Sequence, residues 1–153
     1  MPRKHLQWRR FFLKRNSDVA NSWRFGADID MARTSSKSHE QSVFTALKHV
    51  AGLLAQNCRG PNLVDRLGGE EFVALLEDAG ASEAWAAAER LRSCIEQSPV
   101  TLHRKLQRIT VSVGLSLIVT TDREFDDVLR RADKALYTAN SAGRNRVETE
   151  FES

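Results

Sequence analysis

The chain lacks any apolar run long enough to cross a bilayer, and it has too few cysteines for a disulfide framework. A membrane helix needs ~20 consecutive apolar residues, and no segment of the 153 residues approaches that length. Only Cys58 and Cys94 are present, and both are expected to be reduced. The basic N-terminus precedes no long apolar block and does not resemble a signal peptide. We therefore expect a cytoplasmic protein with no membrane segment.

Acidic residues are absent from the first 15 positions of the chain. These positions hold six basic residues, namely Arg3, Lys4, Arg9, Arg10, Lys14 and Arg15. The whole chain has 23 basic and 20 acidic residues, so residues 16–153 are slightly acidic. This balance argues against nucleic acid as a partner of the domain. Residues 1–18 are interpreted as a basic leader or linker, and the alternative is a basic arm that binds nucleic acid or an anionic membrane.

Alternating apolar residues predict the strands. Trp23, Phe25 and Ala27 alternate within residues 19–30, which predicts a half-buried strand. Two short apolar runs, Leu63-Val64 and Phe72 to Leu76, flank a pair of glycines and predict a hairpin with strands over 63–67 and 72–77. The strictest alternation covers Ile109–Val119 and predicts another strand.

Apolar residues at helical spacing predict three helices. The first covers 43–54, with an inner face formed by Val43, Phe44, Leu47, Val50, Ala51 and Leu54. The second begins after a Ser82 cap and runs to about Gln97, with Trp85 directed inward. The third follows a cap at 120–122 and ends at Gly143. The order of elements predicts an α/β (α+β) fold in which helices pack on a mostly antiparallel sheet.

The predicted hairpin turn is the most informative stretch of the chain. It reads Arg66-Leu67-Gly68-Gly69-Glu70-Glu71-Phe72. Glycines at such a turn let an anion approach the backbone N–H groups. A carboxylate next to a bound phosphate is repulsive unless a divalent cation lies between them. The turn therefore predicts a metal–nucleotide site, with an ordinary hairpin whose acidic residues face solvent as the alternative.

This stretch resembles the signature of the GGDEF family, the diguanylate cyclase domains, in its Gly-Gly-Glu-Glu-Phe variant. Residues 132–137, followed by Gly143-Arg144-Asn145, are similar to the C-terminal signature of the family. The resemblance covers about Val43 to Val147 and is poor in the N-terminal quarter of the chain. It implies a GGDEF domain over residues 19–150. The implied fold is ferredoxin-like and of the nucleotide-cyclase type, and its central β-hairpin carries the Gly-Gly-Glu-Glu turn.

The resemblance also implies an activity. A diguanylate cyclase is a nucleotidyltransferase that condenses two GTP molecules into cyclic di-GMP, a bacterial second messenger, and releases pyrophosphate. The reaction would need Mg²⁺ or Mn²⁺. Each domain would carry one GTP, so a homodimer is required for catalysis. GTP and cyclic di-GMP are the expected small-molecule partners, and an upstream sensor domain or protein is expected as the source of regulation.

By the same resemblance, Asp28 and Glu70 would bind the metal. Asp28-x-Asp30 stands where the family has an Asp-x-Asp motif, although Asp is also common in turns at strand ends. Glu71 follows Glu70 directly, so on a strand the two carboxylates would point to opposite faces. Glu71 would then complete the catalytic group by orienting a neighbouring base or backbone N–H.

Four residues would contact the nucleotide. Gly68 and Gly69 would lie against its phosphates, and the Arg144 guanidinium suits bidentate phosphate contact. Ser35 stands where the family has an Asn that reads the guanine. Two further positions depart from the family: Phe44 replaces an Asp and Asn140 replaces a Lys.

The product-inhibition site of the family would comprise Arg59, Asn62 and Arg90. The family pattern is Arg-x-x-Asp, so Asn62 replaces a carboxylate. A plain Pro/Gly turn around Pro61 and a solvated helix arginine at position 90 are the alternatives.

Two broader alternatives remain open at this point. The departures at Ser35, Phe44, Asn62 and Asn140 also suit a catalytically degenerate GGDEF domain that acts as a nucleotide-sensing or protein-binding regulatory module. The abrupt loss of resemblance before Val43 also suits a segment 1–42 that is not native coding sequence, for example after a frame change. That origin would leave the sheet incomplete.

Overall fold

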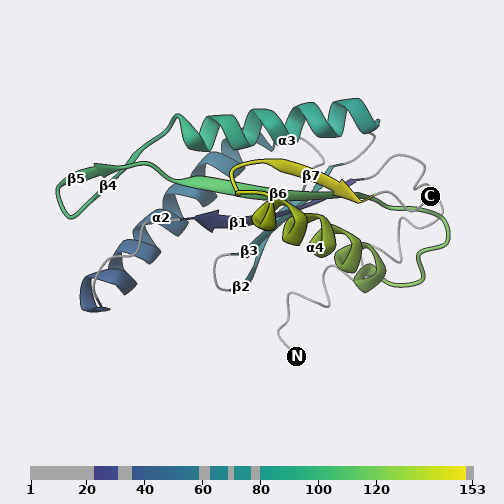
Figure 1. Ribbon diagram of the computed structural model, residues 1–153, viewed down its shortest axis with the longest axis horizontal. Helices are drawn as coiled ribbons and strands as arrows, with labels where there is room; N and C mark the ends of the chain where they lie inside the picture. Colours follow the sequence, from purple (N-terminus) through teal and green to yellow (C-terminus); the bar gives the residue numbers. More distant parts are fainter. Residues whose placement is uncertain (1–22, 31–35, 59–62, 69–70, 77–79, 151–153) are drawn as a thin grey trace.

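The computed structural model describes residues 23–30, 36–58, 63–68, 71–76 and 80–150. Within them a five-stranded sheet has α2 and α3 on one face and α4 on the other (Figure 1). The elements in order are β1 (Trp23–Asp30), α2 (Ser36–Asn57), β2 (Leu63–Gly68), β3 (Glu71–Leu76), α3 (Ala81–Glu96), β4 (Val100–Leu102), β5 (Lys105–Gln107), β6 (Thr110–Leu117), α4 (Phe125–Ser141) and β7 (Val147–Glu150).

Strand β1 lies in the centre of the sheet. The strand order is β2-β3-β1-β6-β7, and β1 is antiparallel to both β3 and β6. Only β7 is added in parallel, next to β6. The predicted α+β class with a mostly antiparallel sheet is confirmed, and the hairpin predicted in the middle of the chain is β2–β3, which lies at one edge of the sheet. Within the strand predicted over 19–30, β1 covers Trp23–Asp30 and pairs on both sides, and positions 19–22 lie outside the described residues.

Strand β6 is buried on both faces, which explains the pattern that predicted it. Val111, Val113 and Leu115 are buried in the cluster that packs under α2 and α3. Ser116, on the other face, donates a hydrogen bond to the Val128 carbonyl of α4 at 3.1 Å. The alternation of apolar with small residues therefore reflects two packing partners, because both faces are covered by helices.

Gly114 is where α4 comes closest to the sheet. A Cβ atom at this position would lie 2.1 Å from the Ala132 carbonyl oxygen and 2.5 Å from the Leu136 nitrogen. Such distances are impossible for a side chain, so the glycine lets the helix backbone rest directly on β6. This contact fixes the height of α4 above the sheet.

Arg131 of α4 is bound to the segment that follows β6 and to the last residue of β6. The Arg131 guanidinium donates to both carboxylate oxygens of Asp122, at 2.6 and 2.7 Å, and to the Leu117 carbonyl at 2.8 Å. Asp122 was expected to cap α4, but the helix begins later, and Asp127 instead accepts from the Arg123 and Glu124 N–H groups. Removal of one partner from such a buried pair is strongly destabilising.

Three side chains predicted to face the core are exposed, namely Phe44 and Ala51 on α2 and Trp85 on α3. Phe44 on α2 is 56% exposed and Trp85 on α3 is 40% exposed. Both stand at the edge of an apolar stripe whose centre is buried, at Leu47 and Val50 on α2 and at Ala84 and Ala88 on α3. The predicted inward positions of Phe44, Ala51 and Trp85 are therefore wrong, because the strands beneath cover only the middle of each stripe.

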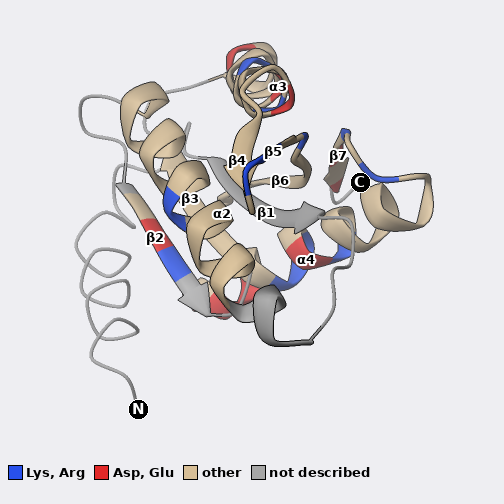
Figure 2. Cartoon of the chain, turned by 90° about the vertical axis from the view of Figure 1, so that its left-hand side faces the viewer, with Lys and Arg blue, Asp and Glu red and all other residues tan. Residues whose placement is uncertain are grey.

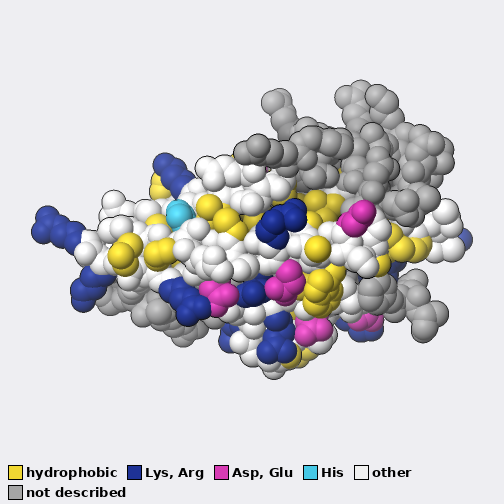
Figure 3. Space-filling view, turned by 90° about the horizontal axis from the view of Figure 1, so that it is seen from above, with side chains coloured by type: hydrophobic (Ala, Val, Ile, Leu, Met, Phe, Trp, Pro, Cys, Tyr) yellow, Lys and Arg dark blue, Asp and Glu magenta, His cyan; other side chains and the backbone are white. Residues whose placement is uncertain are grey.

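Other boundaries differ from the prediction. Helix α2 begins at Ser36, so part of the Ser-rich stretch is helical, and α3 follows a Gly80 cap instead of Ser82. The β4–β5 hairpin was not predicted. Basic side chains gather at the end of the molecule where this hairpin lies (Figure 3). None of the helices in the described segments is long and apolar enough to cross a bilayer.

Two glycine substitutions should have opposite effects on stability. Gly114→Ala forces a methyl group into α4, so the free energy of unfolding should fall by about 1–3 kcal/mol or more. Gly52→Ala is the matched control, because a Cβ atom there meets nothing within 4 Å in an exposed helical position. That variant should gain about 0.5–1 kcal/mol. Urea unfolding of both proteins measures the difference, and equal stability of the two would contradict the close helix approach.

Candidate functional site

The strand register brings the predicted site residues to one end of the sheet. Asp28 of β1 is paired with Glu71 of β3 on one side and with Ser112 of β6 on the other. Glu71 is in turn paired with Gly68 of β2. At the other side of β6, the Val113 N–H donates to the Arg146 carbonyl at 2.9 Å. We call this line of residues, from Gly68 through Glu71, Asp28 and Ser112 to Arg146, the site row.

The Gly-Gly turn lies at the end of the site row. Strand β2 ends at Gly68 and β3 begins at Glu71, so Gly69 and Glu70 form a two-residue connection. The register between the two strands shifts after Arg66, which marks a β-bulge just before the turn. Bulges next to a turn often re-aim the chain at functional sites. Gly69 and Glu70 themselves lie outside the described residues.

Glu71 is exposed and belongs to the α4 face of the sheet. Its neighbours Val73 and Leu75 on the same strand belong to the cluster that packs against Phe125 and Val128 of α4. Side chains alternate along a strand, so Glu71 shares their face. Ser112 lies buried on the site row, and its hydroxyl has no hydrogen-bond partner in the described part of the chain.

Arg144 lies in a strongly constrained turn after α4. Gly143 has φ 112°, as expected for the residue that ends a helix, and Arg144 and Asn145 follow with φ 63° and 47°. The Arg144 N–H donates to the Ala139 carbonyl at 3.0 Å, which completes a Schellman motif. The predicted helix stop at Gly143 thus fits the structure, and the Arg144 side chain is exposed.

A groove of about 340 Å³ lies between α2 and β2 and holds Phe44. Its walls are mostly apolar, with three charged residues, Lys48, Asp65 and Arg66. Lys48 is the only charged residue of α2 between Gln41 and Asn57, and it lines the groove together with Asp65 and Arg66 of β2. Helix α2 runs beside β2, whose acidic and basic segments are coloured red and blue (Figure 2). The Lys48 ammonium sits 4.4 Å from the centroid of the Phe44 ring. This groove can accept a flat apolar group against an aromatic face, with cations beside it.

The predicted product-inhibition residues are only partly described. Arg59 and Asn62 lie outside the described residues. Arg90 lines a small pocket of about 50 Å³ together with Asn57 and Cys58, at the end of α2. Burial raises the pKa of the Cys58 thiol, and the positive charge of Arg90 offsets part of that rise. Arg90 therefore lies near the residue that directly precedes Arg59.

No metal centre can be traced in the described segments. Among their residues, no three His, Cys, Asp or Glu side chains form a group that could hold an ion. Glu70 and Ser35 lie outside the described residues, and Asp28 is placed by its backbone register alone. The pairing of β1 with β3 is the observation that fits a divalent cation, because it sets Asp28 beside Glu71, the residue that follows Glu70.

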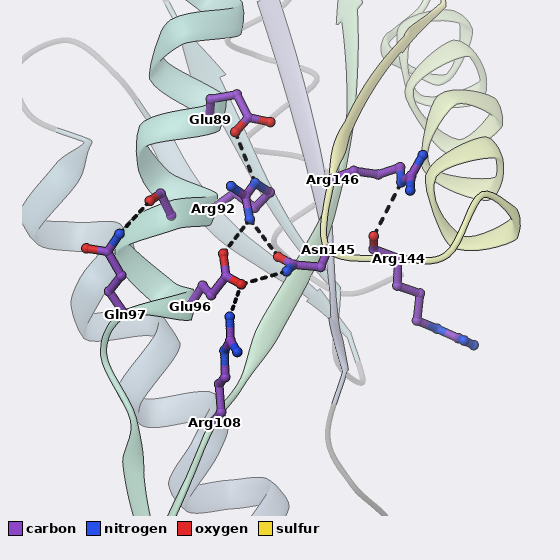
Figure 4. A network of polar contacts seen from close by, with 9 residues as sticks. Glu89, Arg92, Glu96, Gln97, Arg108, Arg144, Asn145 and Arg146 are labelled. Carbon is purple, nitrogen blue, oxygen red and sulfur yellow. Dashed lines mark hydrogen bonds and ion pairs between the residues drawn. The ribbon is translucent and has the colours of Figure 1, made fainter.

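A polar network next to Arg144 was not predicted from the sequence. Glu96, at the end of α3, accepts hydrogen bonds from Arg92 at 2.8 Å and from Asn145 at 3.0 Å, and forms an ion pair with Arg108 (Figure 4). The spacing of Arg92 and Glu96 indicates a helical pair, but no sequence pattern connects either residue with Asn145. These hydrogen bonds, first that from Arg92 and then that from Asn145, lower the pKa of the Glu96 carboxyl.

A second cavity, of about 220 Å³, is polar. It is lined by Gln41, Ser42 and Thr45 of α2 and by Thr101, Leu102 and His103 of the β4–β5 hairpin. Ser42 Oγ lies 2.7 Å from His103 Nε2. The described residues that line this cavity include no carboxylate.

Comparisons with known proteins agree with this arrangement. Residues 41–146 match the family model described as diguanylate cyclase, GGDEF domain. The chain is 37% identical over 101 residues to diguanylate cyclase A of Treponema denticola, which is 66% of this chain and 27% of that protein. It is likewise 37% identical over 103 residues to the response regulator PleD of Caulobacter vibrioides, covering 66% of this chain and 23% of the relative. The chain thus spans about a quarter of the length of these curated relatives.

Solved structures show the same fold. The active GGEEF domain of a diguanylate cyclase from Vibrio cholerae superposes with a TM-score of 0.80 at 25% identity, covering 99% of this chain and 97% of that one. The GGDEF domain of DgcB from Caulobacter crescentus, solved in complex with c-di-GMP, gives 0.81 at 23% identity, covering 94% and 85%. The fold and the turn at the end of the site row define a nucleotide-cyclase-type domain, and the chain belongs to the GGDEF family.

The Glu96 network should make stability depend on pH in the acid range. The pKa of Glu96 is lower in the folded chain than in the unfolded chain. Its contribution to the free energy of unfolding is therefore complete above the unfolded value, about 4.3, and is lost as the pH falls through the folded value. Glu96→Gln should be less stable than the wild type at pH 7, and the difference should shrink toward pH 3. Urea unfolding across this range measures it, and a pH-independent difference would contradict the assignment.

Proposed function

We propose that this domain condenses two GTP molecules into cyclic di-GMP and releases pyrophosphate. The observation that carries the proposal is the pairing of Asp28 with Glu71, because it sets the central strand beside the Gly-Gly-Glu turn. The curated relatives named diguanylate cyclase support it, as does the similarity to an active GGEEF domain. A catalytically degenerate module is not favoured by these comparisons.

Asp28 and Glu70 are proposed to hold the divalent cation. Diguanylate cyclases of this family use divalent metal ions, and we propose Mg²⁺ or Mn²⁺, for which carboxylate oxygens are suitable ligands. A bound cation supplies charge neutralisation and a lower pKa for the attacking 3′-hydroxyl. Glu71, the first residue of β3, is proposed to orient a neighbouring group from the α4 face.

The phosphate chain is proposed to lie against Gly68 and Gly69, where no side chain blocks the backbone N–H groups. Arg144 would contact the phosphates from the turn after α4, since a guanidinium can donate two parallel hydrogen bonds. Ser35 is proposed as a single hydroxyl partner of the nucleoside.

Assembly and context follow from the proposed reaction. Each domain would bring one GTP, so catalysis requires a homodimer. The curated relatives are about four times as long as the matched part of this chain, and an upstream sensor domain or protein is proposed to control the domain. GTP supply makes the cytoplasm the proposed location. Residues 19–150 would form the GGDEF domain, and residues 1–18 a basic leader or linker.

Product inhibition is proposed to be weak. Arg59, Asn62 and Arg90 would form the inhibitory site, and Arg90 lies near the end of the helix that leads to Arg59. Asn62 has no charge with which to hold the arginines. Loss of a charged hydrogen-bond partner costs on the order of 1.5–3 kcal/mol, or roughly ten- to hundredfold in affinity.

Cyclase activity should depend on Glu70. Glu70→Gln keeps the shape of the side chain and removes the charge that a divalent cation needs, so the rate should fall by at least about a hundredfold. Production of cyclic di-GMP from GTP with Mg²⁺ or Mn²⁺ measures it. Glu83→Gln is a control, because that carboxylate only caps α3 at the Gly80 N–H, 3.0 Å away. Retention of most of the wild-type rate by Glu70→Gln would overturn the metal assignment.

Base selection should be poor, because Phe44 offers a ring face where the family has a carboxylate. Each unpaired polar group of a buried base costs about 1–3 kcal/mol. The wild type should therefore bind GTP and ATP with affinities within about tenfold of each other. The triple variant Ser35→Asn, Phe44→Asp, Asn140→Lys should favour GTP by at least tenfold more and turn over faster.

The exposure of Phe44 makes this experiment practicable. The side chain is 56% exposed, so Phe44→Asp should leave the melting temperature nearly unchanged. Phe44→Leu is the matched control, since it keeps an apolar side chain and adds no acceptor, and it should not raise the preference for GTP. Competition calorimetry with the two nucleotides measures the selectivity. Tight, guanine-selective binding by the unaltered protein would contradict the account.

A further inference from the structure

We propose that Glu96 and Asn145, together with Arg92, position Arg144 for the phosphate chain of the nucleotide. The inference rests on the proposed function, because it assumes that Arg144 contacts those phosphates. It adds residues that touch neither the nucleotide nor the metal and that act through the conformation of the turn after α4.

The turn needs an anchor because of its backbone. Three successive residues, Gly143, Arg144 and Asn145, have positive φ. Only glycine adopts this region without steric cost, and two side-chain-bearing residues in succession are held there only by surrounding contacts. The Schellman bond holds Arg144 from the helix side, and Arg146 Nε reaches the Arg144 carbonyl at 3.4 Å.

The Asn145 side chain supplies the anchor on the other side. Its Nδ2 donates to Glu96 Oε1 at 3.0 Å, and its Oδ1 accepts from Arg92 Nη1 at 2.7 Å. Both ends of the amide are therefore used, and the side chain has a single orientation between the two charged groups. Hydrogen bonds to ionised partners are shorter and stronger than neutral ones.

The charged partners of Asn145 are themselves fixed. Arg92 Nε donates to Glu89 at 3.0 Å, and its Nη1 donates to Glu96 at 2.8 Å. The Arg92 and Glu96 side chains are only 16% and 20% exposed, so water screens this pair far less than a surface pair. Arg108, from the segment between β5 and β6, forms an ion pair with Glu96 Oε1, the oxygen that also accepts from Asn145.

The Arg144 side chain points away from this network. Figure 4 shows its side chain extended away from Glu96 and Arg92, while the backbone of the same turn is bound to them through Asn145. The adjacent Arg146 carbonyl belongs to the site row. The network thus holds the turn at the sheet end where the Gly-Gly turn and Asp28 lie, and it leaves the Arg144 guanidinium exposed there.

The test measures binding of GTP and of inorganic tripolyphosphate by calorimetry in the presence of Mg²⁺. Asn145→Gly removes the side-chain anchor but tolerates positive φ, so it separates the anchor from backbone strain. It should weaken binding of both ligands by at least about tenfold. Glu96→Gln keeps an acceptor for Asn145, so it should weaken the binding of both ligands less than Asn145→Gly does. Gln97→Ala is the matched control, because Gln97 caps the end of the same helix and its side chain donates to Ser93 Oγ at 3.0 Å, outside the Glu96 network.

A double-mutant cycle with Arg144→Ala separates positioning from a structural role. If Asn145 acts through Arg144, then Asn145→Gly should have no further effect on affinity in the Arg144→Ala background. Backbone ¹⁵N relaxation of residue 144 should show increased motion in Asn145→Gly and not in Gln97→Ala. Thermal unfolding of each variant accounts for any loss of folded protein.

The outcomes distinguish this inference from the proposed function. Unchanged affinity in Arg144→Ala would refute the phosphate contact itself and the inference with it. Weaker binding in Arg144→Ala, with wild-type binding in Asn145→Gly and Glu96→Gln, would refute only the positioning role. An additive loss in the double variant would also refute it, because the network would then act elsewhere.

Discussion

The direct contact of α4 with β6 at Gly114 is the constraint on which the arrangement of the domain depends. A helix backbone that rests on a strand leaves no room for a side chain, so its position is set by main-chain atoms. Such a contact is rigid because nothing in it can change rotamer. It fixes where α4 ends, and the Schellman turn at Gly143 then directs Arg144 and β7 back to the end of β6.

The site row joins this helix to the Gly-Gly turn through the centre of the sheet. Asp28 pairs with a residue on each side, so the metal-binding residue proposed on β1 and the turn on β2–β3 are held in one register. A two-residue slip of β1 would keep every side chain on its own face and would still separate Asp28 from Glu71. The packing of both sheet faces makes such a slip costly, because Val73, Val111 and Val113 are completely buried.

The sequence alone predicts the fold class, the central hairpin and the family, because those signals are local. Two-residue periodicity in Ile109–Val119 and two glycines between apolar runs are sufficient for them. The exposure of Phe44 and Trp85 was missed because the edge of an apolar stripe is set by the strands that lie beneath it. Strands β4 and β5 have three residues each, too short to show a period. The Glu96 network joins α3, the segment before β6 and the turn after α4, and no pattern along the chain records such proximity.

The central place of β1 also concerns the order of events in folding. The β2–β3 hairpin closes over two residues and can form early, since local contacts form faster than distant ones. The Asp28–Glu71 pair spans more than forty positions of the chain and exists only after β1 has inserted between β3 and β6. A ligand that needs both residues has no partial site to bind on the way. The ligand therefore binds only the fully assembled sheet. By mass action it stabilises the native state, and it does not slow the folding steps that come before the site has formed.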